Sequence, residues 1–164
     1  FAHEMTIQYR KNFKLFTCCG ILFNHESPLR GLEFVTRKIV NSMLKIKNGK
    51  LDKFVLGNID SERDWGFAGD YVEAMWKMLQ IPIPTDFVIS TGESNSVREF
   101  LIRTSELCNI KNWEDVVEFN NVLHSQIDYK QKIGDSTKAK KILKWTAKTN
   151  FNDLVKLMVN DEHF

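Results

Sequence analysis

The feature that most constrains the fold is a nearly continuous apolar run between Lys14 and Asn24, composed of Leu15, Phe16, Cys18, Cys19, Ile21, Leu22 and Phe23. Such a run predicts a strand buried on both faces, as in a parallel sheet covered by helices. The two adjacent cysteines are expected to be buried thiols on opposite faces of that strand. Apolar side chains at helical spacing in residues 1–13 predict a helix that leads into it.

Helical and strand patterns alternate along the rest of the chain, which predicts an α/β fold. Helices are expected over residues 33–48, 69–80, 96–108 and 151–159, and strands over 51–57 and 87–91. Ser96 and Glu99 form a capping-box pattern at the start of one helix. The 69–80 helix is expected to bury an apolar stripe made of Val72, Met75, Trp76 and Leu79.

Composition excludes several functional classes. The 164 residues are enough for one ordinary domain, and a net charge of +2 is too balanced for a nucleic-acid binder. The three cysteines and four histidines show no metal-ligand spacing, so the sequence predicts no metal site. Neither a leader nor an apolar stretch of membrane-spanning length is present, so we expect no membrane partner and a cytoplasmic location.

Two polar segments follow expected strands, at the sheet edge where ligands bind in open α/β proteins. The first offers the amide of Asn24, the imidazole of His25 and the guanidinium of Arg30 on a loop, followed by Lys38 one turn into a helix. This set suits an anionic, hydroxyl-rich ligand, because Arg grips phosphate and Asn pairs with sugar hydroxyls. In the second segment, Arg63 near Trp65 is a candidate diphosphate clamp.

Each of these residues also has a simpler structural interpretation, and the residue types alone leave both open. His25 is compatible with an ordinary surface position, and Arg30 and Lys38 with solvated charges. Arg63 can form a local ion pair with Asp64, and Asn24 can bond to its own backbone.

The same segments carry a family resemblance. GILFNHESPLRG with FVTRKI, and RDWG with DYVEAMW, closely resemble the GDP-mannose 4,6-dehydratases, which are extended short-chain dehydrogenases. The match continues through DFVI with TGE, SVREF and GDSTKAK. It implies an α/β chain with the C-terminal part of a Rossmann-like parallel sheet and a small mixed α/β substrate-binding domain, without the N-terminal dinucleotide-binding strands.

The resemblance also implies a division of the chain. Residues 1–31 would be the last part of the NADP-binding domain, and 32–164 mainly the nucleotide-sugar domain, with strand 51–57 or 87–91 returning to the main sheet. The family forms dimers or tetramers. The catalytic Tyr-x-x-x-Lys pair and the acid/base glutamate beside a threonine would lie before Phe1, so we expect a fragment that is inactive alone.

By the resemblance, the parent enzyme converts GDP-mannose to GDP-4-keto-6-deoxymannose with NADP, the first step of GDP-fucose and deoxyhexose synthesis. His25 and Arg30 would contribute to NADP binding, with Arg30 reaching across a subunit contact. The GDP-sugar site would include Asn24, Val35, Lys38 and Arg63.

The sequence departs from the family pattern near residue 125. Ser125-Gln126 stands where the family shows Arg-Pro, with Asp128 in the acidic place, and the segment 110–126 is shorter. Two alternatives therefore stay open: a degenerate non-catalytic relative, and another nucleotide-sugar dehydratase or epimerase. A sheet missing strands also predicts poor solubility for the isolated chain.

Overall fold

The computed structural model describes residues 1–120 and 133–160 and confirms an α/β fold. The helices are α1 (Ala2–Phe13), α2 (Val35–Lys47), α3 (Ala68–Met78), α4 (Val97–Leu107), α5 (Thr137–Ile142) and α6 (Phe151–Asn160), with a 3-10 helix η1 (Trp113–Asp115). The strands are β1 (Gly20–Leu22), β2 (Asn24–Glu26), β3 (Phe54–Leu56), β4 (Glu62–Arg63), β5 (Trp65–Phe67), β6 (Phe87–Ile89), β7 (Asn95–Ser96) and β8 (Val117–Phe119).

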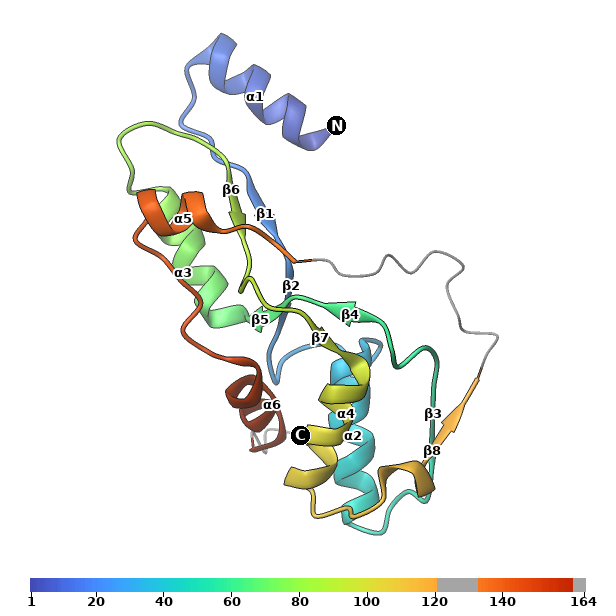
Figure 1. Cartoon of the computed structure of the whole chain (residues 1–164). Coiled ribbons are helices and arrows are strands. Elements are labelled where there is room, and N and C mark those ends of the chain that lie inside the picture. Colours follow the sequence, from blue (N-terminus) through green and yellow to red (C-terminus); the bar gives the residue numbers. More distant parts are fainter. Residues whose placement is uncertain (121–132, 161–164) are drawn as a thin grey trace.

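Strand pairing is mainly parallel, as the sequence predicted. Within the described ranges, β1 pairs with β6, β2 with β5 and β3 with β8 in parallel, while β4 and β7 pair antiparallel. In Figure 1, β1 and β6 lie beside each other near α3 and α5, whereas β3 and β8 lie at the opposite end. The expected strand 87–91 is thus beside β1, and the expected strand 51–57 is beside β8.

The larger apolar core lies where α2, α4 and α6 meet. Ile39, Phe100 and Leu154, one from each helix, have no exposed side-chain surface. Trp65 of β5 joins them, with its ring centroid 5.8 Å from that of Phe100 and 6.4 Å from that of Phe151. Figure 1 shows the three helices together, below the β4 and β7 pair.

A smaller core joins α3, β6 and α5. It contains Tyr71, Phe87, Ile89 and Trp145, all buried. Trp145 packs edge-on against Tyr71, with centroids 6.0 Å apart, and its Nε1 donates a 2.8 Å hydrogen bond to the carbonyl of Asp70.

The predicted inward face of α3 is wrong. Its apolar stripe is exposed, with Val72 at 60% and Trp76 at 63%, and Met75 and Leu79 exposed as well. The buried side chains are instead Asp70, Tyr71, Ala74 and Met78. The Asp70 carboxylate accepts hydrogen bonds from the backbone N–H groups of Lys148 and Thr149, and these bonds fix the rotation of the helix.

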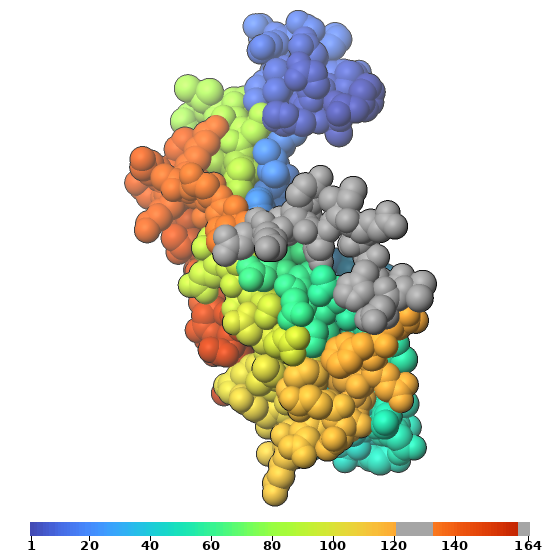
Figure 2. Space-filling view, turned by 45° about the vertical axis from the view of Figure 1, so that its right-hand side comes forward, coloured from blue at the N-terminus to red at the C-terminus, as the bar shows by residue number. Residues whose placement is uncertain are grey.

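The expectation of a strand buried on both faces is also wrong for the first apolar run. Leu15, Phe16 and Ile21 are exposed, and Cys18 and Cys19 are only half-buried. The reason lies in the pairing, since among the described residues β1 has a strand partner on one side only. No residue of α1 is buried, and Figure 2 shows this helix at one end of the molecule. The strand pattern continues as β2 through Glu26, so the predicted loop begins later.

Local signals at the helix ends are confirmed. Ser96 Oγ accepts from Glu99 N at 3.1 Å, and Glu99 Oε2 accepts from Ser96 N at 2.6 Å. Gly49 follows the end of α2 with a φ of +65°, which favours glycine. None of the described helices is long and apolar enough to cross a membrane.

Candidate functional site

His25 lies on β2, which pairs with β5, and two neighbouring groups hold its side chain. Its Nδ1 lies 2.8 Å from the carbonyl oxygen of Phe23, and its ring stacks on Tyr71 with centroids 5.0 Å apart and planes at 30°. A carbonyl oxygen can only accept, so Nδ1 carries the proton and Nε2 of the neutral ring remains an acceptor. His25 is therefore an oriented side chain.

The Tyr71 ring under His25 requires a glycine opposite it. Gly66 pairs with His25 in the strand register, and a Cβ placed on Gly66 would lie 2.3 Å from the Tyr71 ring. Burial raises the pKa of Tyr71, and the charges of Asp64 and Asp70 raise it further. The Tyr71 hydroxyl finds no hydrogen-bond partner among the described residues. Tyr71 is thus a neutral packing surface for the imidazole.

Arg30 is held in the turn after β2. Its Nε lies 3.4 Å from Glu26 Oε2, and its guanidinium carbon lies 3.5 Å from the centroid of the Phe34 ring. Burial raises the pKa of Glu26, although the hydrogen bond from Thr36 and the charge of Arg30 oppose that change. These contacts make Arg30 a positioned cation, whereas the simpler interpretation made it a freely solvated one.

A buried hydrogen bond joins β2 to α2. Thr36 Oγ1 donates to Glu26 Oε2 at 2.7 Å, and both residues are almost fully buried. This bond brings the first turn of α2, with Val35 and Lys38, to the carboxyl end of β2. Val35 is 36% exposed and Lys38 is half-buried, and their i, i+3 spacing places them on one face of the helix.

Arg63 is the last residue of β4, and the chain continues directly into β5, which pairs with β2. Asn24 is the register partner of Trp65, which follows Arg63 by two residues, so Arg63 and Asn24 lie on neighbouring segments. Arg63 Nη1 donates to the carbonyl of Glu62 at 2.7 Å. The predicted clamp with Trp65 is not formed as expected, because the Trp65 side chain is 3% exposed and belongs to the core. The predicted site residues thus lie on β2, in the turn after it, at the start of α2 and on β4. Asn24 is the first residue of β2, and Arg63 precedes β5, so these two lie at the amino end of the β2–β5 pair.

Sequence reasoning gave Asp64 no structural role beyond a local ion pair, yet it anchors the loops beside this site. Asp64 has no exposed surface, and its Oδ1 accepts from Thr91 N at 2.9 Å and Thr91 Oγ1 at 2.6 Å. Its Oδ2 accepts from Gly92 N at 2.9 Å and Gly134 N at 3.2 Å. The TGE and GD motifs can be recognised in the sequence. Only the fold shows that backbone N–H groups of both motifs donate to the Asp64 carboxylate.

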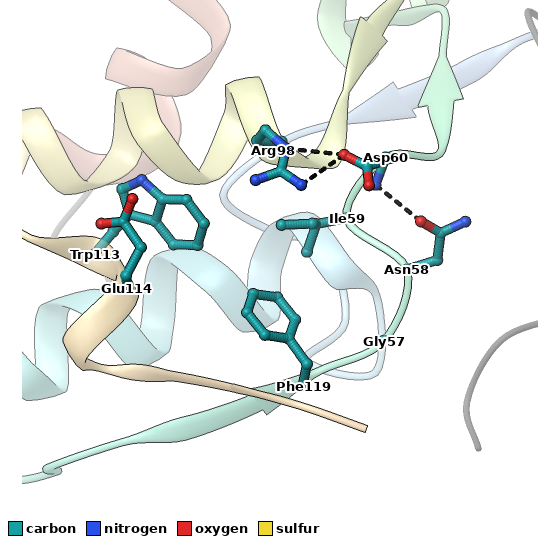
Figure 3. A pocket seen from close by; sticks show the side chains of 8 residues that line it. All are labelled: Gly57, Asn58, Ile59, Asp60, Arg98, Trp113, Glu114 and Phe119. Carbon is teal, nitrogen blue, oxygen red and sulfur yellow. Dashed lines mark hydrogen bonds and ion pairs between the residues drawn. The ribbon is translucent and has the colours of Figure 1, made fainter. Parts of the chain in front are cut away.

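A hollow of about 390 Å³ opens nearby, after β3. It is lined by Gly57, Asn58, Ile59, Asp60, Arg98, Trp113, Glu114 and Phe119 (Figure 3). Arg98 forms a two-pronged ion pair with Asp60, with both its Nε and Nη2 2.8 Å from Asp60 Oδ1. None of the predicted site residues lines this hollow, so the predicted site is a surface on β2, α2 and β4.

The departures at Ser125, Gln126 and Asp128 lie outside the described residues, as does the last part of the shortened segment, residues 121–126. Their effect on the site stays a prediction.

Solved structures with this fold are enzymes of nucleotide-sugar and nicotinamide-dinucleotide chemistry. The RMD protein of Pseudomonas aeruginosa, solved with NADPH, superposes with a TM-score of 0.86 at 14% identity, over 96% of this chain and 52% of that one. A dTDP-glucose 4,6-dehydratase of Bacillus anthracis, solved with NAD, gives 0.82 at 19% identity, over 96% and 48%. The chain therefore shares its fold with about half of each of these two proteins.

Sequence comparison specifies the family within that class. The family model described as GDP-mannose 4,6 dehydratase matches residues 1–158, and the chain belongs to this family. GDP-mannose 4,6 dehydratase 1 of Arabidopsis thaliana is 48% identical over 98% of this chain and 44% of its own length. The human GDP-mannose 4,6 dehydratase is 44% identical over 98% and 47%. The chain thus spans less than half the length of these relatives.

Proposed function

We propose that this chain is the nucleotide-sugar-binding part of a GDP-mannose 4,6-dehydratase, and that the whole enzyme makes GDP-4-keto-6-deoxymannose for GDP-fucose or deoxyhexose synthesis. The observation that carries the proposal is that the family's binding motifs lie on β2, in the turn after it, at the start of α2 and on β4. Residues 1–31 would complete the dinucleotide-binding domain, and residues 32–164 would form mainly the sugar-nucleotide domain.

Charge supports the assignment of the GDP-sugar site to Asn24, Val35, Lys38 and Arg63. Lys38 on α2 and Arg63 on β4 are half-buried cations, and their positive charge suits a diphosphate. The exposed Asn24 amide can both donate to and accept from sugar hydroxyls, and exposed Val35 offers an apolar contact for a base.

His25 and Arg30 are proposed to contact NADP. The Nε2 acceptor of His25 suits the N–H groups of the nicotinamide carboxamide, and the Arg30 guanidinium suits a phosphate of the dinucleotide. Solved neighbours hold NADPH or NAD, which supports a nicotinamide dinucleotide as the cofactor. NADP, when bound, would accept a hydride from the sugar and return it, while residues of this chain bind and orient the sugar nucleotide.

We further propose that the full protein is cytoplasmic and assembles as a homodimer or homotetramer, with Arg30 extending to the cofactor site of a second subunit. Light scattering of the full protein, with and without an Arg30→Ala change, tests the assembly. A monomer with full cofactor affinity would contradict it.

A binding experiment tests the substrate assignment. The chain is fused to the N-terminal half of a curated relative, and GDP-mannose binding is followed by calorimetry. Arg63→Ala should weaken binding by about 10-fold to 150-fold, since a charged hydrogen bond contributes about 1.5–3 kcal/mol. Arg103→Ala is the matched control, because Arg103 is paired with Glu106 on the exposed side of α4.

The outcome also separates the alternatives. If dTDP-glucose or UDP-glucose binds more tightly than GDP-mannose, the protein is another nucleotide-sugar dehydratase or epimerase. If no sugar nucleotide binds to a folded fusion, the chain is a degenerate relative without catalytic function.

A further inference from the structure

Three side chains that commonly bind metals meet at the base of β1 and β6. They are His3 on α1, Cys19 immediately before β1 and Asp86 immediately before β6, and their ligand atoms lie within 4.8 Å of one another. His3 Nε2 is 3.0 Å from Asp86 Oδ2. Spacing along the chain predicted no metal site, because these ligands come from three separate segments that only the fold brings together.

The carboxylate of this group is already oriented. Asp86 Oδ1 accepts from the backbone N–H of Cys19 at 2.9 Å and from Arg10 Nη2. Asp86 Oδ2 accepts from Arg10 Nη1 at 3.4 Å and lies 3.0 Å from His3 Nε2. Burial raises the pKa of Asp86, but the hydrogen bonds from Arg10, Cys19 N and His3 outweigh it and lower the pKa to about 2. The Asp86 carboxylate is therefore held in place by hydrogen bonds from Arg10 and from the Cys19 backbone.

A second layer of hydrogen bonds holds the supporting arginine. Arg10 Nε donates to the carbonyl of Thr17 at 2.7 Å, and Thr17 Oγ1 donates to the carbonyl of Thr6 at 3.4 Å. These bonds tie α1 to the segment that leads into β1. Partners of this kind, bonded to a ligating carboxylate, orient it and strengthen metal sites.

We propose that His3, Cys19 and Asp86 form a zinc-binding site that clamps α1 to the starts of β1 and β6. A thiolate, an imidazole and a carboxylate are the ligand types that zinc prefers, and three protein ligands leave a fourth position for water. The thiolate and the carboxylate together carry the two negative charges that balance Zn²⁺.

The three ligand side chains need to move only a little to coordinate zinc. Tetrahedral zinc places neighbouring ligand atoms about 3.5 Å apart. The His3 side chain is 52% exposed, so its ring can rotate to close the remaining distance without disturbing the core. The proposal rests on these contacts and does not depend on the proposed function.

Zinc titration against a chromogenic chelator tests the proposal, with the whole 164-residue chain as the sample. We expect one Zn²⁺ per chain, and at least tenfold weaker binding in Cys19→Ser and in His3→Ala. Cys18→Ser is the matched control, because Cys18 Sγ donates to the carbonyl of Met78 and faces α3. With Co²⁺ as the probe, a thiolate-to-cobalt absorption band should appear in the wild type and in Cys18→Ser, and be absent in Cys19→Ser.

A second measurement keeps the test decisive if a variant misfolds. Alkylation of the unmodified chain is mapped by mass spectrometry with and without Zn²⁺. Zinc should slow alkylation of Cys19 at least tenfold and leave Cys18 and Cys108 unchanged. Equal protection of Cys18 and Cys19, an unchanged rate at Cys19, or the absence of saturable one-to-one binding overturns the proposal.

Discussion

The α2–α4–α6 core and the α1–β1 region are built from similarly apolar sequence, yet they end in opposite environments. Ile39, Phe100 and Leu154 are fully buried, while Phe13 is 64% and Ile21 is 49% exposed. The first set of side chains is buried because three amphipathic helices face one another. The second lies on a helix without a buried residue and on a strand that, among the described residues, is paired on one side only. Apolar content therefore indicates a surface to be covered, and the available partners decide whether it is covered.

The largest effect should come from opening the well-packed core. Phe100→Ala removes a ring that packs against Trp65 and Phe151, and should cost about 3–5 kcal/mol of the free energy of unfolding. Urea denaturation followed by circular dichroism measures this change. A loss of unfolding free energy below about 1 kcal/mol would mean that the side chains of this core are packed as poorly as those of α1.

The next effect concerns the loops that border the core. Asp64→Asn replaces Oδ2 by an amide nitrogen that faces the N–H groups of Gly92 and Gly134, so one part-buried and one buried hydrogen bond are lost. We expect a loss of about 3 kcal/mol. Asp60→Asn is the control and should cost less than about 1 kcal/mol, because the Asp60 side chain is 69% exposed. Equal losses of unfolding free energy in the two variants would show that the Asp64 hydrogen bonds do not stabilise the fold.

A smaller, pH-dependent effect is expected where β2 joins the core. Burial raises the pKa of Glu26 above its ordinary 4.5, so the folded protein holds this proton more tightly than the unfolded chain does. The resulting stabilisation is fully present below pH 4.5 and is lost as the pH rises through the folded pKa. Glu26→Gln should flatten the stability profile over that interval. A profile of unchanged slope in urea melts at several pH values would refute this assignment.

The smallest effect is expected in the α1 region. Phe13→Ala trims an exposed ring and should change the free energy of unfolding by less than about 0.5 kcal/mol, in contrast to the same change at Phe100. Sedimentation of both proteins should show less self-association for Phe13→Ala, because it removes exposed apolar surface. A large loss of stability on this change would mean that α1 packs against other groups in solution.

Local sequence patterns were sufficient for the elements that depend on neighbours in the chain. The capping box at Ser96 and Glu99, the glycine stop at Gly49 and the positions of α2 and α4 depend on groups within a few residues, so their patterns predict them directly. The family motifs likewise placed Asn24, His25 and Lys38 near one sheet edge, because a strand followed by a loop and a helix fixes their order.

The sequence could not supply the rotation of α3, the use of Asp64 or the meeting of His3 with Cys19 and Asp86. Each depends on groups tens of residues away, such as the Lys148 and Thr149 amides that turn Asp70 inward and leave Trp76 outside. The sequence by itself determined where the main helices lie and which family the chain belongs to. Only the tertiary structure decided which faces are buried, because burial is a property of the partners that a face meets.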